Sequence, residues 1–347
     1  MILPSTYYAT LALLVLSMLC WGSWANTIKL TGKWRFELFY FDYSLGLMMA
    51  AVIAALTFGT LGFDGFSFMD DLLHASKKQD LYGFAAGVIF NLANILLVAA
   101  ISLAGMAVAF PVSIGLALVI GVGLSYVIKP QGSPVLLFAG AAIVLSAVVV
   151  NAIAYKAYKL TQVDDLVRTG KVKSTKRQVS TKGVVIAIIS GFLMGSFFPL
   201  VELGKAGDTG LGPYAIGFVF ALGVFLSTFL FNLFFMNLPV SGPPVEVLEY
   251  FRGTLRQHLL GILGGAVWYA GAIFAFVAAS AEGKASVGPA VSYGLGQGAT
   301  LISALWGLLV WKEFAGAQPK VNSMLAVMLA LFALGLVMIS VAPLVGR

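Results

Sequence analysis

The stretch GFAAGVIFNLANILLVAAISLAGMAVAFP, Gly83 to Pro111, returns in a looser form as GILGGAVWYAGAIFAFVAASAEGKASVGP, Gly261 to Pro289. At an offset of 178 positions, and without a gap, eight of the 29 aligned pairs are identical. Those pairs are Gly83/Gly261, Gly87/Gly265, Ile95/Ile273, Ala100/Ala278, Ser102/Ser280, Gly105/Gly283, Ala107/Ala285 and Pro111/Pro289. Both stretches are apolar, and neither carries a charge in its first two thirds. Such a repeat indicates a transporter of two related halves, with its site where the halves meet.

The composition is that of an α-helical membrane protein. Mean hydropathy is +0.97, and 10% of the residues are charged, whereas a soluble domain carries roughly 25%. The single cysteine, Cys20, excludes an intrachain disulfide framework. The two histidines, His74 and His258, fall in expected connecting segments far apart in sequence, which argues against a zinc site. The net charge of +7 comes mostly from a few loops, so membrane topology explains it better than nucleic-acid binding.

Ten stretches are suited to span a bilayer, which takes about 20 mostly apolar residues in a helix. They cover residues 6–29, 37–61, 81–103, 105–128, 133–157, 182–203, 211–237, 258–281, 284–310 and 320–343. The first stretch has no basic segment before it and is long enough to span, so we expect a membrane helix there and not a cleaved signal peptide. The junctions near residues 104 and 282 are short enough to require tight hairpins. The sequence predicts an all-α integral membrane protein with ten transmembrane helices.

The strongly basic stretch from Lys156 to Lys182 separates the first five helices from the last five. If this stretch is cytoplasmic, its side holds 15 of the 21 Lys and Arg residues, an arrangement that the retention of basic loops favours. Without this stretch the balance is seven to six. Five helices per half place equivalent helices in opposite senses, so we expect an inverted repeat. The expected parts are a first repeat over 1–157, a basic cytoplasmic loop over 158–181 and a second repeat over 182–347.

Further matches between the halves support the repeat. Gly22-Ser23-Trp24 corresponds to Gly195-Ser196-Phe197, and Ser113-Ile114-Gly115 corresponds to Ser292-Tyr293-Gly294 after a one-residue gap. The alternative is that small residues recur by chance in membrane helices. Chance explains any single match more easily than it explains the ungapped alignment across two helices and a hairpin.

Several motifs resemble those of the ureide permeases, a family of the drug/metabolite transporter superfamily. They are GSWANTIKL at 22–30, FDYSLGLMMAAVIAALTFG at 41–59, GFAAGVIFNLANILLVAAISLAGMAVAFPVSIGLALVIG at 83–121 and WGLLVWKEF at 306–314. The layout is also similar to that of bacterial glucose/ribose porters and, more distantly, of rhamnose–proton symporters. The resemblance implies two inverted five-helix repeats and proton-coupled uptake of a small uncharged polar solute. For ureide permeases such solutes are allantoin and oxo-heterocycles such as uracil, and for the porters they are sugars.

The central loop reads VRTGKVKSTKRQ at 167–178, without the GxxxxGK[ST] spacing that cradles phosphates. We therefore expect no ATP site and no cofactor, and coupling to an ion gradient. No HExxH motif or readable pair of nucleophile and base inside the membrane supports an enzyme. The expected partners are a neutral polar solute, protons and the lipid bilayer, for a monomer or homodimer in a bacterial plasma membrane. Export of amphipathic compounds and sugar–proton symport are the competing functions.

Two acidic residues are candidates for proton coupling, because charges inside membrane helices are costly and usually functional. Asp42 lies about one turn into the second helix and matches the Asp-Tyr pair of the family. The alternative for Asp42 is an interfacial ion pair with Lys33 or Arg35. Glu202 follows Pro199 near the end of the sixth helix, and its alternative is an ion pair with Lys205, three residues on.

Uncharged polar and aromatic residues at mid-helix are the candidate solute contacts. Helical spacing places Asn91 and Asn94 on one face, and likewise Tyr293 and Gln297. The full set is Trp24, Asn91, Asn94, Ser113, Trp268, Tyr269, Tyr293 and Gln297. Amides, hydroxyls and aromatic rings suit a neutral solute with both donors and acceptors. The alternative is that such side chains only bond neighbouring helices, each contributing about 0.6 kcal/mol in lipid, and that Trp24 is an interface anchor.

Pro111 and Pro289 occupy equivalent positions of the fourth and ninth helices. Each lacks an amide donor and is expected to kink its helix. The two kinks would serve as hinges or as packing devices.

Overall fold

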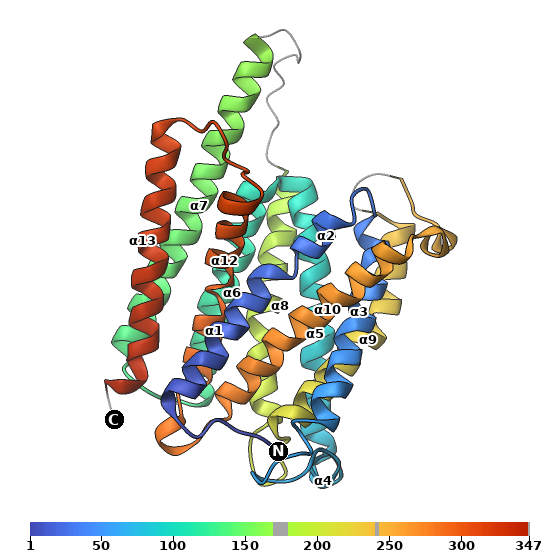
Figure 1. Cartoon of the computed structure of the whole chain (residues 1–347), viewed down its shortest axis with the longest axis vertical. Coiled ribbons are helices and arrows are strands. Elements are labelled where there is room, and N and C mark those ends of the chain that lie inside the picture. The colour runs from blue at the N-terminus through green and yellow to red at the C-terminus, as the bar shows by residue number, and fades with distance from the viewer. Residues whose placement is uncertain (169–179, 240–242, 346–347) are drawn as a thin grey trace.

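Every regular element in the part of the chain that the structure describes is helical (Figure 1). The computed structural model describes residues 1–168, 180–239 and 243–345. The longer helices are α1 Tyr7–Ser23, α3 Phe36–Leu56, α5 Lys77–Ala104, α6 Met106–Ile128, α7 Pro134–Arg168, α8 Thr181–Gly204, α9 Pro213–Asn237, α10 Leu255–Ala279 and α13 Pro319–Val341. The shorter elements are α2 Asn26–Leu30, α4 Phe68–His74, η1 Val247–Arg252, η2 Gly283–Ala285, α11 Pro289–Gly296, α12 Ala299–Leu305, the π-helical turn η3 Trp306–Val310 and η4 Ala342–Leu344.

Within these residues, ten helical spans are long and apolar enough to cross a membrane. The first combines α1 with α2, and the ninth combines η2, α11, α12 and η3. Both termini lie at one end of the bundle, and α7 projects from the opposite end (Figure 1). The predicted fold class, an all-α membrane protein with ten spans, is confirmed.

Hydroxyl side chains define where several helices begin. The side chains of Thr6, Ser76 and Ser180 each accept a hydrogen bond from the backbone amide three residues on. Thr254 forms a reciprocal capping box with Gln257 at the start of α10. Such caps satisfy amides that have no partner inside the helix, contributing about 1 kcal/mol each. The cap at Thr254 places the first turn of α10 a few residues earlier than predicted, so that His258 lies within the helix.

The ninth span differs from its prediction as one continuous kinked helix. Pro289 is the first residue of α11 after Gly288, at a position where a missing amide costs nothing, so it starts a helix and kinks none. The break falls later, at Gln297 and Gly298, between α11 and α12. The junction predicted near residue 282 is therefore a longer connection with one 3₁₀ turn, not a tight hairpin. Pro111, in contrast, lies inside the continuous helix α6.

Two other boundaries bear on the predictions. Gly105, with a φ of 82°, joins α5 directly to α6 and confirms the tight hairpin expected there. Helix α7 runs on to Arg168, so the first part of the basic stretch 158–181 continues the fifth span. The remainder of that stretch, 169–179, lies outside the described residues.

Helices from one half of the chain pack against helices from the other half. In the first half α5 packs against α8 and α9, and in the second half α10 packs against α1 and α3. Glycine allows the closest approaches: a Cβ on Gly87 would lie 2.1 Å from the carbonyl oxygen of Phe220, and one on Gly265 would lie 1.8 Å from that of Tyr43. Gly87 and Gly265 are aligned in the repeat. This reciprocal packing supports the predicted inverted repeat.

Candidate functional site

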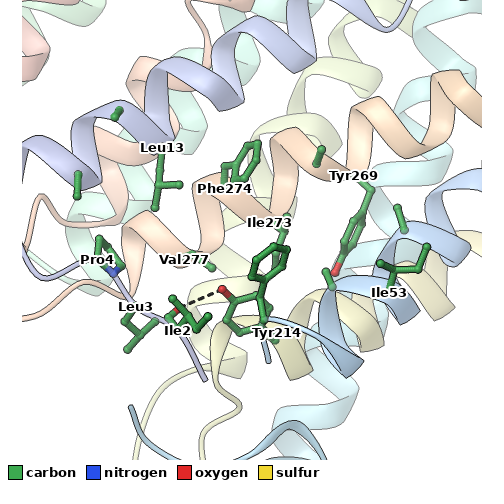
Figure 2. A pocket seen from close by; sticks show the side chains of 16 residues that line it. Ile2, Leu3, Pro4, Leu13, Ile53, Tyr214, Tyr269, Ile273, Phe274 and Val277 are labelled. Carbon is green, nitrogen blue, oxygen red and sulfur yellow. Dashed lines mark hydrogen bonds between the residues drawn. The ribbon is translucent and has the colours of Figure 1, made fainter. Parts of the chain in front are cut away.

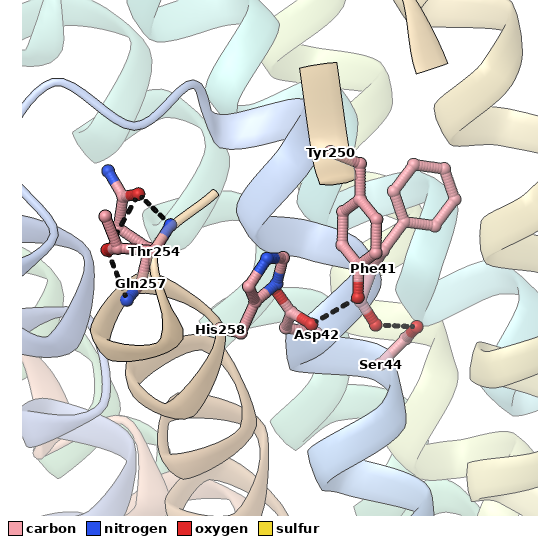
Figure 3. A network of polar contacts seen from close by, with 7 residues as sticks. All are labelled: Phe41, Asp42, Ser44, Tyr250, Thr254, Gln257 and His258. Atoms are coloured by element: carbon pink, nitrogen blue, oxygen red, sulfur yellow. Dashed lines mark hydrogen bonds and ion pairs between the residues drawn. The ribbon is translucent and has the colours of Figure 1, made fainter. Parts of the chain in front are cut away.

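Asp42 is buried near the start of α3, where it joins three separate elements of the chain (Figure 3). The hydroxyl of Tyr250, in η1, donates a hydrogen bond to its Oδ1 at 2.6 Å. Nδ1 of His258, in the first turn of α10, lies 2.8 Å from its Oδ2. A carboxylate held between a phenol and an imidazole can bind and release a proton without leaving its site.

The alternative pairing of Asp42 with Lys33 or Arg35 does not form in this structure. Arg35 instead holds Glu37, with Nη2 at 2.6 Å from Oε1. Position along the helix explains why Arg35 pairs with Glu37, because Arg35 is the N-cap of α3 and Glu37 lies in its first turn. Asp42, more than one turn further along the helix, faces α10.

Rings enclose the imidazole of His258. Tyr250 packs edge-on to it with ring centroids 4.7 Å apart, and Trp34 does the same at 5.7 Å. Burial, followed by the hydrogen bond to Asp42, raises the pKa of Tyr250 above its ordinary value. The phenol therefore stays protonated and remains a donor throughout the physiological pH range.

Glu202, the second coupling candidate, lies near the end of α8, whereas Asp42 lies near the start of α3. The end of α8 and the start of α3 are at opposite ends of the bundle (Figure 1). Its Oε1 accepts a hydrogen bond from the ammonium of Lys205 at 2.6 Å, and both side chains are buried. Burial lowers the pKa of Lys205 from its ordinary value, although Glu202 opposes that shift. The ion pair considered as the alternative is therefore present, and a coupling role for Glu202 stays a proposal.

Two of the candidate solute contacts meet in one polar and aromatic cluster between the first three spans. Nδ2 of Asn94 donates to the hydroxyl of Tyr40 at 3.1 Å, and the rings of Tyr40 and Tyr43 stack at 4.9 Å. The ring of Trp24 lies 5.0 Å from that of Tyr43. Among the described residues, the buried hydroxyl of Tyr43 has no hydrogen-bond partner. A buried donor without a partner is costly, and a bound solute is one way to satisfy it.

A second aromatic cluster contains Trp268 and Tyr293. The ring of Trp268 lies 4.2 Å from that of Phe90, and Phe90 packs edge-on to Phe197 at 5.3 Å. Phe197 in turn packs against Tyr293 at 6.1 Å. The hydroxyl of Tyr293 donates to the carbonyl oxygens of two other helices, at residues 117 and 194, each at 3.3 Å. Tyr293 therefore ties the two halves together through its own hydrogen bonds.

Three other candidates bond or face neighbouring helices in this structure. Asn91 donates to Ser227 at 2.7 Å and to Thr228 at 3.1 Å on α9. Ser113 pairs with Ser190 of α8 at 2.8 Å. Helical spacing puts Asn91 and Asn94 near one another. At the crossing with α9 the amide of Asn91 bonds that helix, whereas the amide of Asn94 bonds Tyr40. Gln297 is half-buried at the end of α11, beside the break in the ninth span.

Tyr269 lines a cavity of about 600 Å³ that lies toward the end of the bundle where the chain begins (Figure 2). The other side chains around it are mostly aliphatic and come from the N-terminal segment, α1, α3, α9 and α10. Ile2, Leu13, Ile53 and Ile273 are among them. Of the candidate solute contacts, only Tyr269 belongs to this lining, so the cavity and the polar cluster are different places.

No group of three or more His, Cys, Asp and Glu in the described ranges could hold a metal ion. Reasoning from the sequence missed the roles of His258 and Tyr250 because both are more than 200 residues from Asp42 and one was assigned to a connection. It also passed over Tyr40 and Tyr43. These two, one turn apart on the helix that carries Asp42, could have been found from that spacing.

Comparison with known proteins places the chain among transporters. The family model described as "Ureide permease" matches residues 39–183. Ureide permease 1 of Arabidopsis thaliana is 24% identical over 372 residues, covering 93% of this chain and 94% of the relative. Ureide permease 2 of the same plant is 23% identical over 380 residues, with coverage of 93% and 94%.

A solved structure, described only as "Crystal structure of protein", has a TM-score of 0.60 and 17% sequence identity. The alignment covers 96% of this chain and 98% of that one, and it supports the fold alone. The family match covers Asp42, Tyr40, Tyr43 and Asn94 but not Trp24. The plant relatives align along nearly the whole chain. The chain is therefore similar to the ureide permeases along nearly its whole length, and this similarity supports a membrane transporter.

Proposed function

We propose that this chain is a proton-coupled permease that takes up a small neutral polar metabolite, a ureide or an oxo-heterocycle such as allantoin, uracil or a purine. The names of its relatives support the ureide class. Such solutes are planar or nearly so, carry amide-like donors and acceptors, and have no net charge. They need stacking surfaces and neutral hydrogen-bonding groups, and no charged partner.

The buried hydroxyl of Tyr43 is the observation that carries this proposal. It has no partner among the described residues, and the ring that carries it lies 5.0 Å from the ring of Trp24. That ring also stacks on Tyr40, whose hydroxyl accepts from the amide of Asn94; the amide nitrogen donates and the amide oxygen accepts. A ureide placed here would exchange hydrogen bonds with the hydroxyl and the amide while its plane packs on the indole. Trp268 and Tyr293 belong to the neighbouring aromatic cluster and would enclose the solute from the second half.

Coupling to protons would use Asp42 at one end of the bundle and Glu202 at the other. Two buried acids at opposite ends suit alternating access, because each can exchange its proton only when its own side is open. The two halves, 1–157 and 182–347, would rock about the central cluster. Pro111 inside α6 would act as a hinge, and Pro289 would start the broken ninth span beside it.

The proposed location is a bacterial plasma membrane with the basic stretch 158–181 on the cytoplasmic side. The end of α7, the start of α3, which carries Asp42, and η1 lie at the same end of the bundle (Figure 1). Asp42 would then discharge its proton to the cytoplasm, and Glu202 would meet the outer solution. Either a monomer or a homodimer is compatible with this arrangement.

Uptake into proteoliposomes with an imposed pH gradient tests the proposal. Allantoin and uracil should each compete with a radiolabelled ureide, and glucose should not. Strong competition by glucose alone would support sugar–proton symport. Net transport of the solute only from the cytoplasmic side of the protein to the opposite side would support an exporter. Uptake that ignores the pH gradient would contradict proton coupling.

Variants of the polar cluster locate the solute. Tyr43→Phe removes one hydroxyl and Asn94→Ala removes one amide, so each should raise the apparent Kd for the solute by roughly 5–50-fold, the effect of one buried hydrogen bond. Asn237→Ala is the matched control, since that amide is exposed and only bonds the carbonyl of Leu233. Unchanged affinity in both cluster variants would place the solute elsewhere.

A further inference from the structure

His258 lies directly beside the buried carboxylate of Asp42 (Figure 3). The side chain of Asp42 is 2% exposed, whereas that of His258 is 22% exposed. Nδ1 of the imidazole faces Oδ2 of Asp42, and Nε2 points toward Gly253, in the connection between η1 and α10. One nitrogen therefore contacts the acid, and the other lies toward the connection between η1 and α10.

The other titratable side chains near this imidazole are occupied or distant. On α3, Glu37 is paired with Arg35, and on η1, Glu249 is paired with Arg252. On α2, Lys29 is paired with Glu313, and Arg256 on α10 itself is exposed. Helices α1, α9 and α11 carry no Asp, Glu, Lys, Arg or His. In the described part of the chain, His258 contacts the carboxylate of Asp42 and the ring of Tyr250.

Tyr250 adds a mechanical link to this pair. Its hydroxyl, bonded to Oδ1 of Asp42, attaches η1 to α3, and its ring packs edge-on to His258. A hydrogen bond to an ionised carboxylate is roughly twice as strong as one to a neutral acceptor. The contact that holds η1 against the bundle therefore weakens when Asp42 gains a proton.

We propose that His258 is the proton relay between Asp42 and the aqueous compartment on the central-loop side, and that Tyr250 is the positioning residue that ties this exit to η1. This inference rests on the proton coupling proposed above. In the release step, protonated Asp42 gives its proton from Oδ2 to Nδ1 while Nε2 gives its proton to water. The imidazole ends neutral with the other nitrogen protonated, and exchange with water returns it to its first tautomer. One proton leaves the protein and Asp42 becomes a carboxylate.

Chemical rescue of His258→Ala tests the relay in full-length protein reconstituted in proteoliposomes. Removing a positioned proton donor and acceptor slows proton transfer by roughly 10²–10⁴-fold, so gradient-driven uptake should fall by at least tenfold. Counterflow exchange of solute, which needs no net proton movement, should stay near the wild-type rate. Imidazole supplied on the central-loop side should restore much of the gradient-driven uptake. Pyrazole, a ring of equal size and far weaker basicity, should not restore it.

Several controls separate this role from a structural one. His74→Ala removes the other histidine, which is exposed on α4, and should leave both assays unchanged. Wild-type protein in the same imidazole buffer measures any loss of the gradient itself. His258→Gln keeps a polar side chain and should show the same pattern as His258→Ala. Tyr250→Phe should lower the coupling ratio of protons to solute while imidazole leaves that defect unchanged.

The outcomes distinguish the relay from the proposed function. If wild-type uptake ignores the pH gradient, proton coupling and the relay both fall. If wild type is coupled and both His258 variants keep full gradient-driven uptake, the relay alone is wrong. Equal rescue by imidazole and pyrazole, or loss of counterflow in both His258 variants, would assign the side chain a packing role and overturn the inference.

Discussion

Replacing Asp42 by asparagine tests the centre of the proposed coupling mechanism while keeping the shape of the side chain. As a carboxylate, Asp42 accepts one hydrogen bond from Tyr250 at 2.6 Å and contacts His258 at 2.8 Å. Hydrogen bonds to a charged group contribute about 1.5–3 kcal/mol each, and neutral ones about 0.5–1.5 kcal/mol. An amide offers one acceptor to Tyr250 and one donor to His258, so it can keep both contacts as neutral hydrogen bonds. The difference for the two contacts together is about 2–3 kcal/mol.

Solvent reduces this figure, because the His258 side chain is 22% exposed and partly screened. The low end, about 2 kcal/mol for both contacts, is the better expectation, and the Tyr250 contact that holds η1 against α3 accounts for about half of it, a roughly 5-fold shift in that equilibrium. Hydrogen–deuterium exchange across Val247–Arg252 should therefore be faster by about that factor in Asp42→Asn than in wild type. Flanking peptides of α10 should change little.

Transport by the same variant gives the second measurement. Asp42→Asn should lose accumulation driven by a pH gradient and keep counterflow exchange, because the amide binds no proton at physiological pH. Normal pH-dependent accumulation of solute together with an unchanged hydrogen–deuterium exchange rate in η1 would refute the reasoning. An unchanged hydrogen–deuterium exchange rate with lost accumulation would leave Asp42 as the coupling residue and remove the link to η1.

Two further predictions concern packing and pH. Gly265→Ala places a methyl group 1.8 Å from the carbonyl oxygen of Tyr43, so α3 and α10 must separate. The loss of about 1–3 kcal/mol of folding stability should lower the thermal midpoint in detergent. Gly123→Ala is the control because a Cβ there meets nothing within 4 Å, and equal midpoints for the two variants would contradict the close crossing. Burial lowers the folded-state pKa of Lys205 below 10.5, so the unfolded chain binds more protons between the two pKa values and this group makes stability rise with pH in that window. Lys205→Gln should flatten the rise in midpoint measured up to pH 10, and an unchanged slope would assign it to other groups.

Much of the architecture followed from local pattern. Apolar runs of bilayer length predicted all ten spans, because a chain in lipid must satisfy its backbone hydrogen bonds within each segment. The structure adds that the aligned pair Gly87 and Gly265 lies where helices approach closely. The sequence pattern gave a wrong prediction at the ninth span, where Pro289 starts a helix and was expected to kink one. Proline is compatible with both a helix kink and the first position of a helix, so its place in the sequence does not distinguish them.

The site was predictable only in part. The acid, the amide of Asn94 and the ring of Trp24 could be chosen from the sequence because polar groups inside lipid are rare and need a reason. Asn91 shows the limit, since it has the same chemistry three residues away and bonds α9 instead. Which of two equivalent amides meets a neighbouring helix depends on the crossing of α5 with α9, and helical spacing within α5 does not contain that information.

The sequence by itself determined the class and the ten spans, and it contained the similarity between the two halves and the resemblance to the ureide permeases, because each depends on the order and polarity of residues along the chain. The tertiary structure alone decided that Asp42 meets Tyr250 and His258, which lie 208 and 216 residues away. It also decided that the Tyr43 hydroxyl is buried without a partner. The physical reason is that lipid sets a length and a polarity for every span, whereas contacts between spans depend on how the helices rotate and cross. Small residues such as Gly265 allow those crossings, and only the folded bundle shows which side chains they bring together.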